Sequence, residues 1–141
     1  MAPQFNTFDD IFQKTTLGNG LRVVTSHHAN AKSVAISIFV GVGSRYESED
    51  QAGISHFIEH MVFKGTKRRP SPREVSATIE ETGGVINAGT EQELTNYWCK
   101  IPAYHFRESL DLLIDLLRNS MFELEDIEKE RMVIIEELNS I

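Results

Sequence analysis

Residues 71–101 read SPREVSATIEETGGVINAGTEQELTNYWCKI and predict one helix followed by two strands. Ser71 can cap the helix, the proline after it suits the first turn, and a glutamate three residues after the serine completes a capping box. The glycine pair 83–84 ends this helix. Val85–Thr90 and Leu94–Ile101 then predict two strands that a polar turn connects.

The same mixture of elements continues on both sides of this stretch. Expected strands cover residues 13–17, 21–26 and 33–42. Expected helices cover residues 54–64, 105–119 and 125–139. We expect the first of these helices to be buried, with Gly65 closing its C-terminus. Strands come first and then mix with helices, so we expect an α+β fold in which helices pack on a largely antiparallel β-sheet.

Length and composition restrict the classes of function. A chain of 141 residues with a net charge of -7 fits one domain and lacks the basic surface of a nucleic-acid-binding protein. We therefore expect no nucleic-acid partner. No apolar run approaches the roughly 20 residues that span a bilayer, so we expect no membrane partner either. Cys99 is the single cysteine, which excludes an intrachain disulfide. The lack of disulfides and of a visible targeting segment favours a location in the cytoplasm.

The last helix carries apolar residues that need a further packing partner. They occupy its final turns, at Ile134, Ile135, Leu138 and Ile141. We therefore expect residues 1–141 to form an incomplete domain, or a chain that requires a partner.

The chemistry of the chain centres on His56-Phe57-Ile58-Glu59-His60. Positions i, i+3 and i+4 of a helix share a face, so two imidazoles and a carboxylate point into one small volume. Neutral histidines are good zinc ligands, and a nearby carboxylate can take a proton from water. The rest of this helix is apolar, where unpaired ionisable groups cost several kcal/mol, so we favour a metal site over a chance surface pattern.

Catalytic zinc usually takes three protein ligands, so a third must come from elsewhere in the chain. Glu130 and Glu137 are seven residues apart and share one helical face with apolar neighbours. The residues alone do not choose between these two glutamates. The other acidic residues of this region are more simply explained as solvated surface.

The segment from His56 to Thr66, HFIEHMVFKGT, resembles the zinc site of the pitrilysin/insulinase family of metallopeptidases, which includes the mitochondrial processing peptidase. The family motif is H-x-x-E-H, followed by 76 residues and a glutamate, and 76 residues separate His60 from Glu137 here. The resemblance implies that Glu137 is the third zinc ligand. It also implies that Glu59 is the catalytic base and that Glu130 supports catalysis without binding zinc.

Further stretches share this resemblance, at residues 43–47, 83–90 and 94–97. In the family, the strand that contains Asn87 and Ala88 is a sheet edge to which substrate adds as another strand. The resemblance therefore implies that Asn87, Ala88 and Phe63 bind substrate. From the residues alone, a strand-end or turn asparagine is the simpler interpretation of Asn87.

The resemblance implies a zinc-dependent endopeptidase that hydrolyses extended or unfolded peptides and has a fold like that of the mitochondrial processing peptidase. Residues 1–141 would be the N-terminal, zinc-binding part of its first domain. Family enzymes continue past this glutamate into a second, similar domain, so we expect a homologous domain or subunit as partner. The alternative is a half-domain or partner subunit that binds zinc and peptide without efficient cleavage.

Overall fold

The computed structural model describes residues 12–140, and their contacts divide them into two units. One unit ends at Ala31, and the other begins at Lys32. The first unit is a hairpin of β1 (Phe12–Thr16) and β2 (Arg22–Ser26), paired antiparallel. In its turn Gly20 has φ +87°, and the Asn19 side chain accepts the Leu21 N–H at 3.1 Å.

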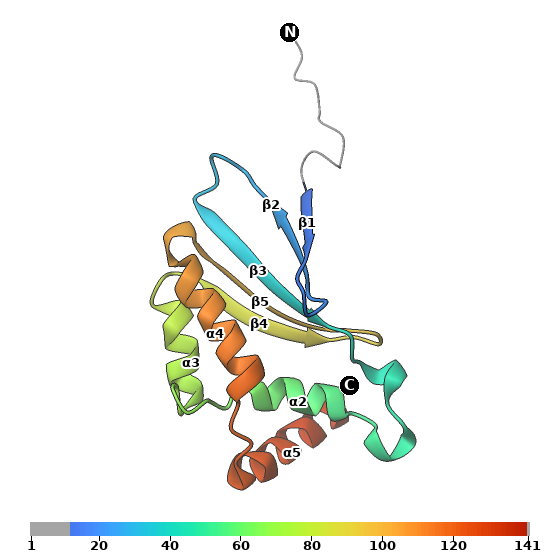
Figure 1. The fold of residues 1–141 in the computed structure, drawn as a ribbon. Coiled ribbons are helices and arrows are strands. Elements are labelled where there is room, and N and C mark those ends of the chain that lie inside the picture. The colour runs from blue at the N-terminus through green and yellow to red at the C-terminus, as the bar shows by residue number, and fades with distance from the viewer. Residues whose placement is uncertain (1–11, 141) are drawn as a thin grey trace. The chain divides into compact units, whose positions relative to one another are not determined.

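The second unit contains a three-stranded antiparallel sheet (Figure 1). Its strands are β3 (Ser33–Val40), β4 (Val85–Thr90) and β5 (Thr95–Pro102), in the order β3-β5-β4. The strand β5 therefore has a neighbour on each side, whereas β4 lies at an edge. This arrangement confirms the predicted antiparallel sheet, and it agrees with the edge position expected of the strand that holds Asn87.

Two helices pack on one face of this sheet, α3 (Pro72–Glu80) and α4 (Phe106–Asn119) (Figure 1). Alternate residues of β5 point toward them, because successive strand side chains face opposite ways. The α3 cap forms as predicted, with the Glu74 N–H donated to the Ser71 hydroxyl at 3.3 Å. The buried core consists of Val62, Val75, Ile79, Tyr97, Cys99, Ile101, Leu112, Leu113 and Leu116.

Helix α2 (Ile54–Val62) packs against α5 (Leu124–Asn139) and against β4. The expectation of a buried helix is met on one side of α2 only: Met61 and Val62 are buried, whereas Ile54 and Ile58 are 43% and 39% exposed. The reason is that only the side of α2 toward these two elements is covered. Short 3₁₀ turns precede α2 at Ser44–Tyr46 and Glu49–Gln51, and another precedes α4 at Ala103–His105. None of the described helices is both long and apolar enough to cross a membrane.

The expected closure of α2 by Gly65 was wrong. The helix ends at Val62, and Phe63 occupies the cap position. Gly65 instead has φ +140° in the following loop, and a Cβ there would lie 2.9 Å from the Arg69 carbonyl oxygen. The glycine is thus needed for a close backbone approach after the helix, not for the helix end.

A buried polar cluster ties this loop to α4. The Asp115 carboxylate is 2% exposed and accepts hydrogen bonds from Thr66 (2.8 Å), Arg69 (2.6 Å) and Asn119 (2.9 Å). Burial acts to raise the pKa of Asp115, but these hydrogen bonds and the Arg69 charge outweigh it, so the pKa is lowered. The cluster fixes the segment that leaves α2.

We predict that Asp115→Asn lowers the free energy of unfolding by about 1–3 kcal/mol at pH 7, because buried donors lose a charged acceptor. Denaturant titration measures the change, and the exposed Asp111→Asn serves as control and should cost less. Because the pKa of Asp115 is lower in the folded than in the unfolded chain, its carboxylate stabilises the fold at pH values above the unfolded-state pKa. This stabilisation is lost as the pH falls through the folded-state pKa. The difference between wild type and D115N should therefore shrink below about pH 4. Equal effects of the two variants would contradict this assignment.

Candidate metal centre

Helix α2 presents His56 and His60 one turn apart, with their rings edge to face and their centroids 4.5 Å apart. The two Nε2 atoms lie 2.9 Å from each other. Two imidazole nitrogens at this distance cannot both present lone pairs without repulsion, so a proton or a cation must lie between them. The helical spacing therefore produces the paired imidazoles that the sequence predicted.

The start of α2 is fixed by a carboxylate from the preceding loop. Gly53 occupies the N-cap with φ +88°, and Glu47 accepts the backbone N–H groups of Gly53 (2.7 Å) and Ser55 (2.8 Å). Hydrogen bonds from the Ser55 side chain, the Ser55 N–H and the Gly53 N–H lower the pKa of Glu47. Sequence reasoning missed this role, although an acidic residue just before a helix suits the helix dipole.

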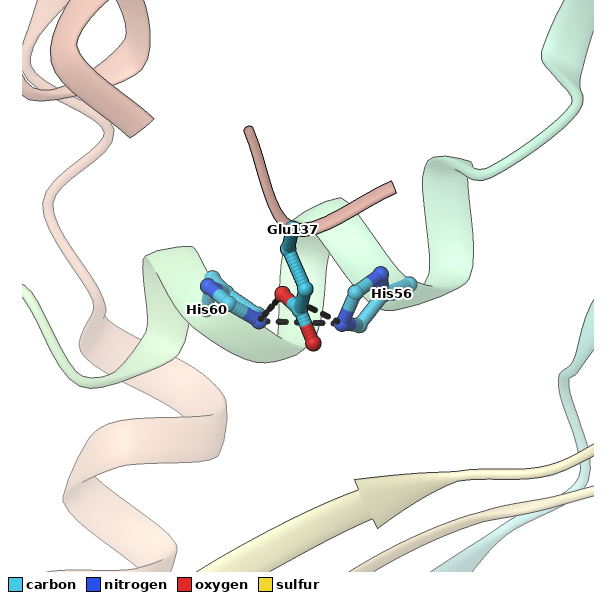
Figure 2. A group of neighbouring side chains, drawn as sticks. All are labelled: His56, His60 and Glu137. Atoms are coloured by element: carbon cyan, nitrogen blue, oxygen red, sulfur yellow. Dashed lines mark hydrogen bonds and ion pairs between the residues drawn. The ribbon is translucent and has the colours of Figure 1, made fainter. Parts of the chain in front are cut away.

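Helix α5 brings the Glu137 carboxylate between the two rings, as Figure 2 shows. Its Oε2 lies 3.9 Å from His56 Nε2 and 3.8 Å from His60 Nε2. All three ligand atoms lie within 4.8 Å of one another, and no other such group of three occurs among residues 12–140. The structure thus places Glu137, rather than Glu130, beside both histidines.

These three side chains fit a zinc ion. Bonds of 2.0–2.2 Å in a tetrahedral site place neighbouring ligand atoms about 3.3–3.6 Å apart. The Nε2–Nε2 distance of 2.9 Å lies below this range, and the two Nε2–Oε2 distances of 3.8 and 3.9 Å lie above it. Two imidazoles and one carboxylate are a common ligand set of catalytic zinc. The Glu137 side chain is 49% exposed, so the site is open to solvent on one side. We treat His56, His60 and Glu137 as predicted zinc ligands.

Glu130 holds His60 from the opposite side of its ring. Its Oε1 lies 2.8 Å from His60 Nδ1, and its Oε2 pairs with the Lys64 ammonium. Burial acts to raise the pKa of Glu130, which is 5% exposed, but the hydrogen bonds and charges of Lys64 and His60 outweigh it, so the pKa is lowered. A charged Glu130 favours a proton on Nδ1, which leaves the Nε2 lone pair free for a metal.

Glu59, the predicted base, projects toward β4 rather than toward α5. Its Oε2 accepts a 2.5 Å hydrogen bond from the Thr90 hydroxyl. The buried Tyr97 is also close enough to Glu59 to feel its charge: burial first, and then the Glu59 carboxylate, raise the pKa of Tyr97 to about 12. The sequence alone predicted neither contact, because both join segments that are far apart in the chain.

The predicted substrate-binding residues lie on two elements. Asn87 and Ala88 are in the edge strand β4, where Asn87 is exposed and its Oδ1 accepts the Ala88 N–H at 2.8 Å. Phe63 follows α2 and is half-buried, and its ring centroid lies 6.4 Å from that of Tyr97. The roles of all three in substrate binding remain predictions.

The model of the insulinase family, peptidase family M16, matches residues 22–141. The chain belongs to this family. Among curated relatives, a probable beta subunit of the mitochondrial-processing peptidase of Arabidopsis thaliana is 43% identical over 90% of this chain and 24% of that protein. An uncharacterized zinc protease of Bacillus subtilis is 39% identical over 91% of this chain and 31% of that protein. The chain thus spans about a quarter to a third of the length of these relatives.

Solved structures of this family agree with the fold. A protease from Helicobacter pylori superposes with a TM-score of 0.84 at 31% identity, covering 89% of this chain and 30% of that chain. The periplasmic protease PqqL from Escherichia coli also gives 0.84 at 29% identity, covering 93% of this chain and 15% of that chain. The predicted α+β class and the predicted membership of a metallopeptidase family are confirmed.

We predict that Glu137→Gln weakens zinc binding by more than about 100-fold, because a neutral amide replaces a charged ligand. Glu130→Gln should weaken it by about 10–100-fold, through loss of the charged partner of His60. Competition with a chromophoric chelator measures both constants. Glu136→Gln, an exposed neighbour on α5, should bind zinc as the wild type does. Wild-type affinity in E137Q would contradict the ligand assignment.

Proposed function

We propose that this chain carries the zinc site of an endopeptidase that hydrolyses peptide bonds in extended or unfolded peptides. The observation that carries the proposal is the convergence of His56 Nε2, His60 Nε2 and the Glu137 carboxylate, with Glu59 on the same helix as the two histidines. Relatives named as zinc protease and as mitochondrial-processing peptidase support the same conclusion.

In this proposal His56, His60 and Glu137 hold the zinc ion. A bound zinc ion supplies the Lewis acidity that polarises a peptide carbonyl and lowers the pKa of water to about 7. Glu59 accepts the proton of the attacking water and returns it to the leaving amine. Glu130 keeps the proton of His60 on Nδ1, so that Nε2 remains a ligand throughout.

The edge strand β4 is the proposed docking line for substrate. It pairs with β5 along one side only, so its other side can form main-chain hydrogen bonds with an extended peptide. Asn87 and Ala88 lie in the middle of this strand, and α2 packs against it. Main-chain pairing selects for an extended backbone rather than for side chains, which suits unfolded peptides.

A partner of the same family completes the proposal. This chain spans 24% and 31% of two relatives, and one of these is named as a subunit of a processing peptidase. We infer that a second homologous domain or subunit covers the open side of the zinc site when substrate binds. Peptide cleavage should therefore be measured with that partner present.

We predict that Glu59→Gln abolishes zinc-dependent cleavage while zinc binding stays within about twofold of the wild type. The amide cannot accept a proton, whereas the ligands are unchanged. Cleavage of an unfolded quenched-fluorescent peptide, with and without a chelator, and metal analysis of the same samples measure the two properties. Wild-type cleavage by E59Q would disprove the assigned base. Zinc binding by the wild type without any cleavage would instead favour a non-catalytic partner subunit.

Asn87→Ala tests the substrate strand. We expect KM for an unfolded peptide to rise about two- to tenfold, the range expected for one lost hydrogen bond, because the exposed amide can no longer bind the peptide main chain. The catalytic constant should change less, since Asn87 lies on β4 whereas the predicted ligands lie on α2 and α5. Steady-state kinetics separate the two parameters. An unchanged KM would show that Asn87 does not contribute to substrate binding along β4.

A further inference from the structure

We propose that Thr90 is a positioning residue for Glu59: its hydroxyl holds one carboxylate oxygen and leaves the other to face substrate. This inference rests on the proposed function, because it assigns a task to Thr90 only if Glu59 is the base. It arises from a contact between α2 and the edge strand β4 that the sequence alone did not predict.

The contact is short and comes from a rigid part of the sheet. Thr90 Oγ1 lies 2.5 Å from Glu59 Oε2, and Thr90 is the last residue of β4. The strand turns tightly after it, with the Glu91 N–H donated to the Leu94 carbonyl at 2.9 Å. Thr90 then pairs directly with Thr95 of β5. The hydroxyl is therefore held at the base of a hairpin.

Counting protons fixes the direction of this hydrogen bond. An ionised carboxylate can only accept, and a threonine hydroxyl has one proton, so the Thr90 proton goes to Glu59 Oε2. Thr95 Oγ1 lies 3.3 Å from Thr90 Oγ1 and donates to the Val42 carbonyl oxygen at 3.1 Å. Thr95 thus has its own acceptor and does not compete for the Thr90 proton.

Glu59 needs such a partner because helix α2 fixes only its backbone. The side chain is half-buried and keeps three rotatable bonds, and a base must lie within hydrogen-bond reach of its proton donor. A donor on Oε2 selects one of these orientations and leaves Oε1 available. Since Asn87 and Thr90 belong to the same strand, the strand that is proposed to bind peptide also sets the orientation of the base.

Three variants separate positioning from folding. Thr90→Val keeps the side-chain volume and removes the hydroxyl, Thr90→Ser keeps the hydroxyl, and Thr82→Val removes a half-buried hydroxyl that bonds the Ile79 carbonyl oxygen away from Glu59. In the zinc-loaded protein with its partner, we expect T90V to lower kcat about 10–100-fold, as for residues that orient a catalytic group. We expect KM and zinc affinity to stay within about twofold, and T90S and T82V to retain a kcat close to wild type.

The second measurement does not depend on catalysis. Crystal structures of the wild type and T90V should show Glu59 bonded to Thr90 in the first and in a different or disordered rotamer in the second. An unchanged Glu59 rotamer in T90V, an unchanged kcat, or a failure of serine to restore kcat would each overturn the positioning role. If the wild type binds zinc but cleaves no peptide, the proposed function fails, while the Glu59 rotamer still tests the Thr90 contact.

Discussion

The site depends on the direction of the two His60 nitrogens. The buried Glu130 pairs with the half-buried Lys64 and contacts His60 Nδ1 at 2.8 Å, so His60 Nε2 points toward His56 and Glu137. Without the Glu130 contact, the His60 ring could rotate or change tautomer. A protonated nitrogen, rather than a lone pair, could then face His56 and Glu137. The electrostatics of one buried carboxylate therefore favour the ring orientation in which the three predicted ligands can share a cation.

That geometry requires α2 to be held at both ends, and the chain does this with charged side chains. Glu47 accepts two N–H groups at the start of the helix. Beyond its end, Thr66 donates to the buried Asp115 of α4, which also pairs with Arg69. Apolar packing covers only part of α2: Met61 and Val62 are buried, whereas Ile54 and Ile58 are exposed. Polar anchoring thus replaces part of the apolar packing that usually fixes a core helix.

Local regularities explain what could be predicted from the sequence. Helical period brought His56 and His60 together, and the seven-residue spacing put Glu130 and Glu137 on one face of α5. The residues alone did not choose between these glutamates, because the choice depends on how α5 crosses α2. The Thr90 contact and the Glu47 cap were missed for the same reason: each joins segments whose relative placement is set by tertiary packing. Gly65 was misplaced because the Thr66–Arg69 loop, rather than the helix, requires it.

In this arrangement, substrate docking and proton transfer would depend on the same strand, β4. An edge strand gains order when a peptide pairs with it, because its unpaired side then acquires main-chain hydrogen bonds. Thr90 lies on that strand, and its hydroxyl is the hydrogen-bond partner of Glu59. An extended peptide that pairs with β4 would therefore lie beside a carboxylate that the same strand already orients. A base that β4 orients before substrate binds needs no reorganisation when the peptide arrives, which favours proton transfer in the complex.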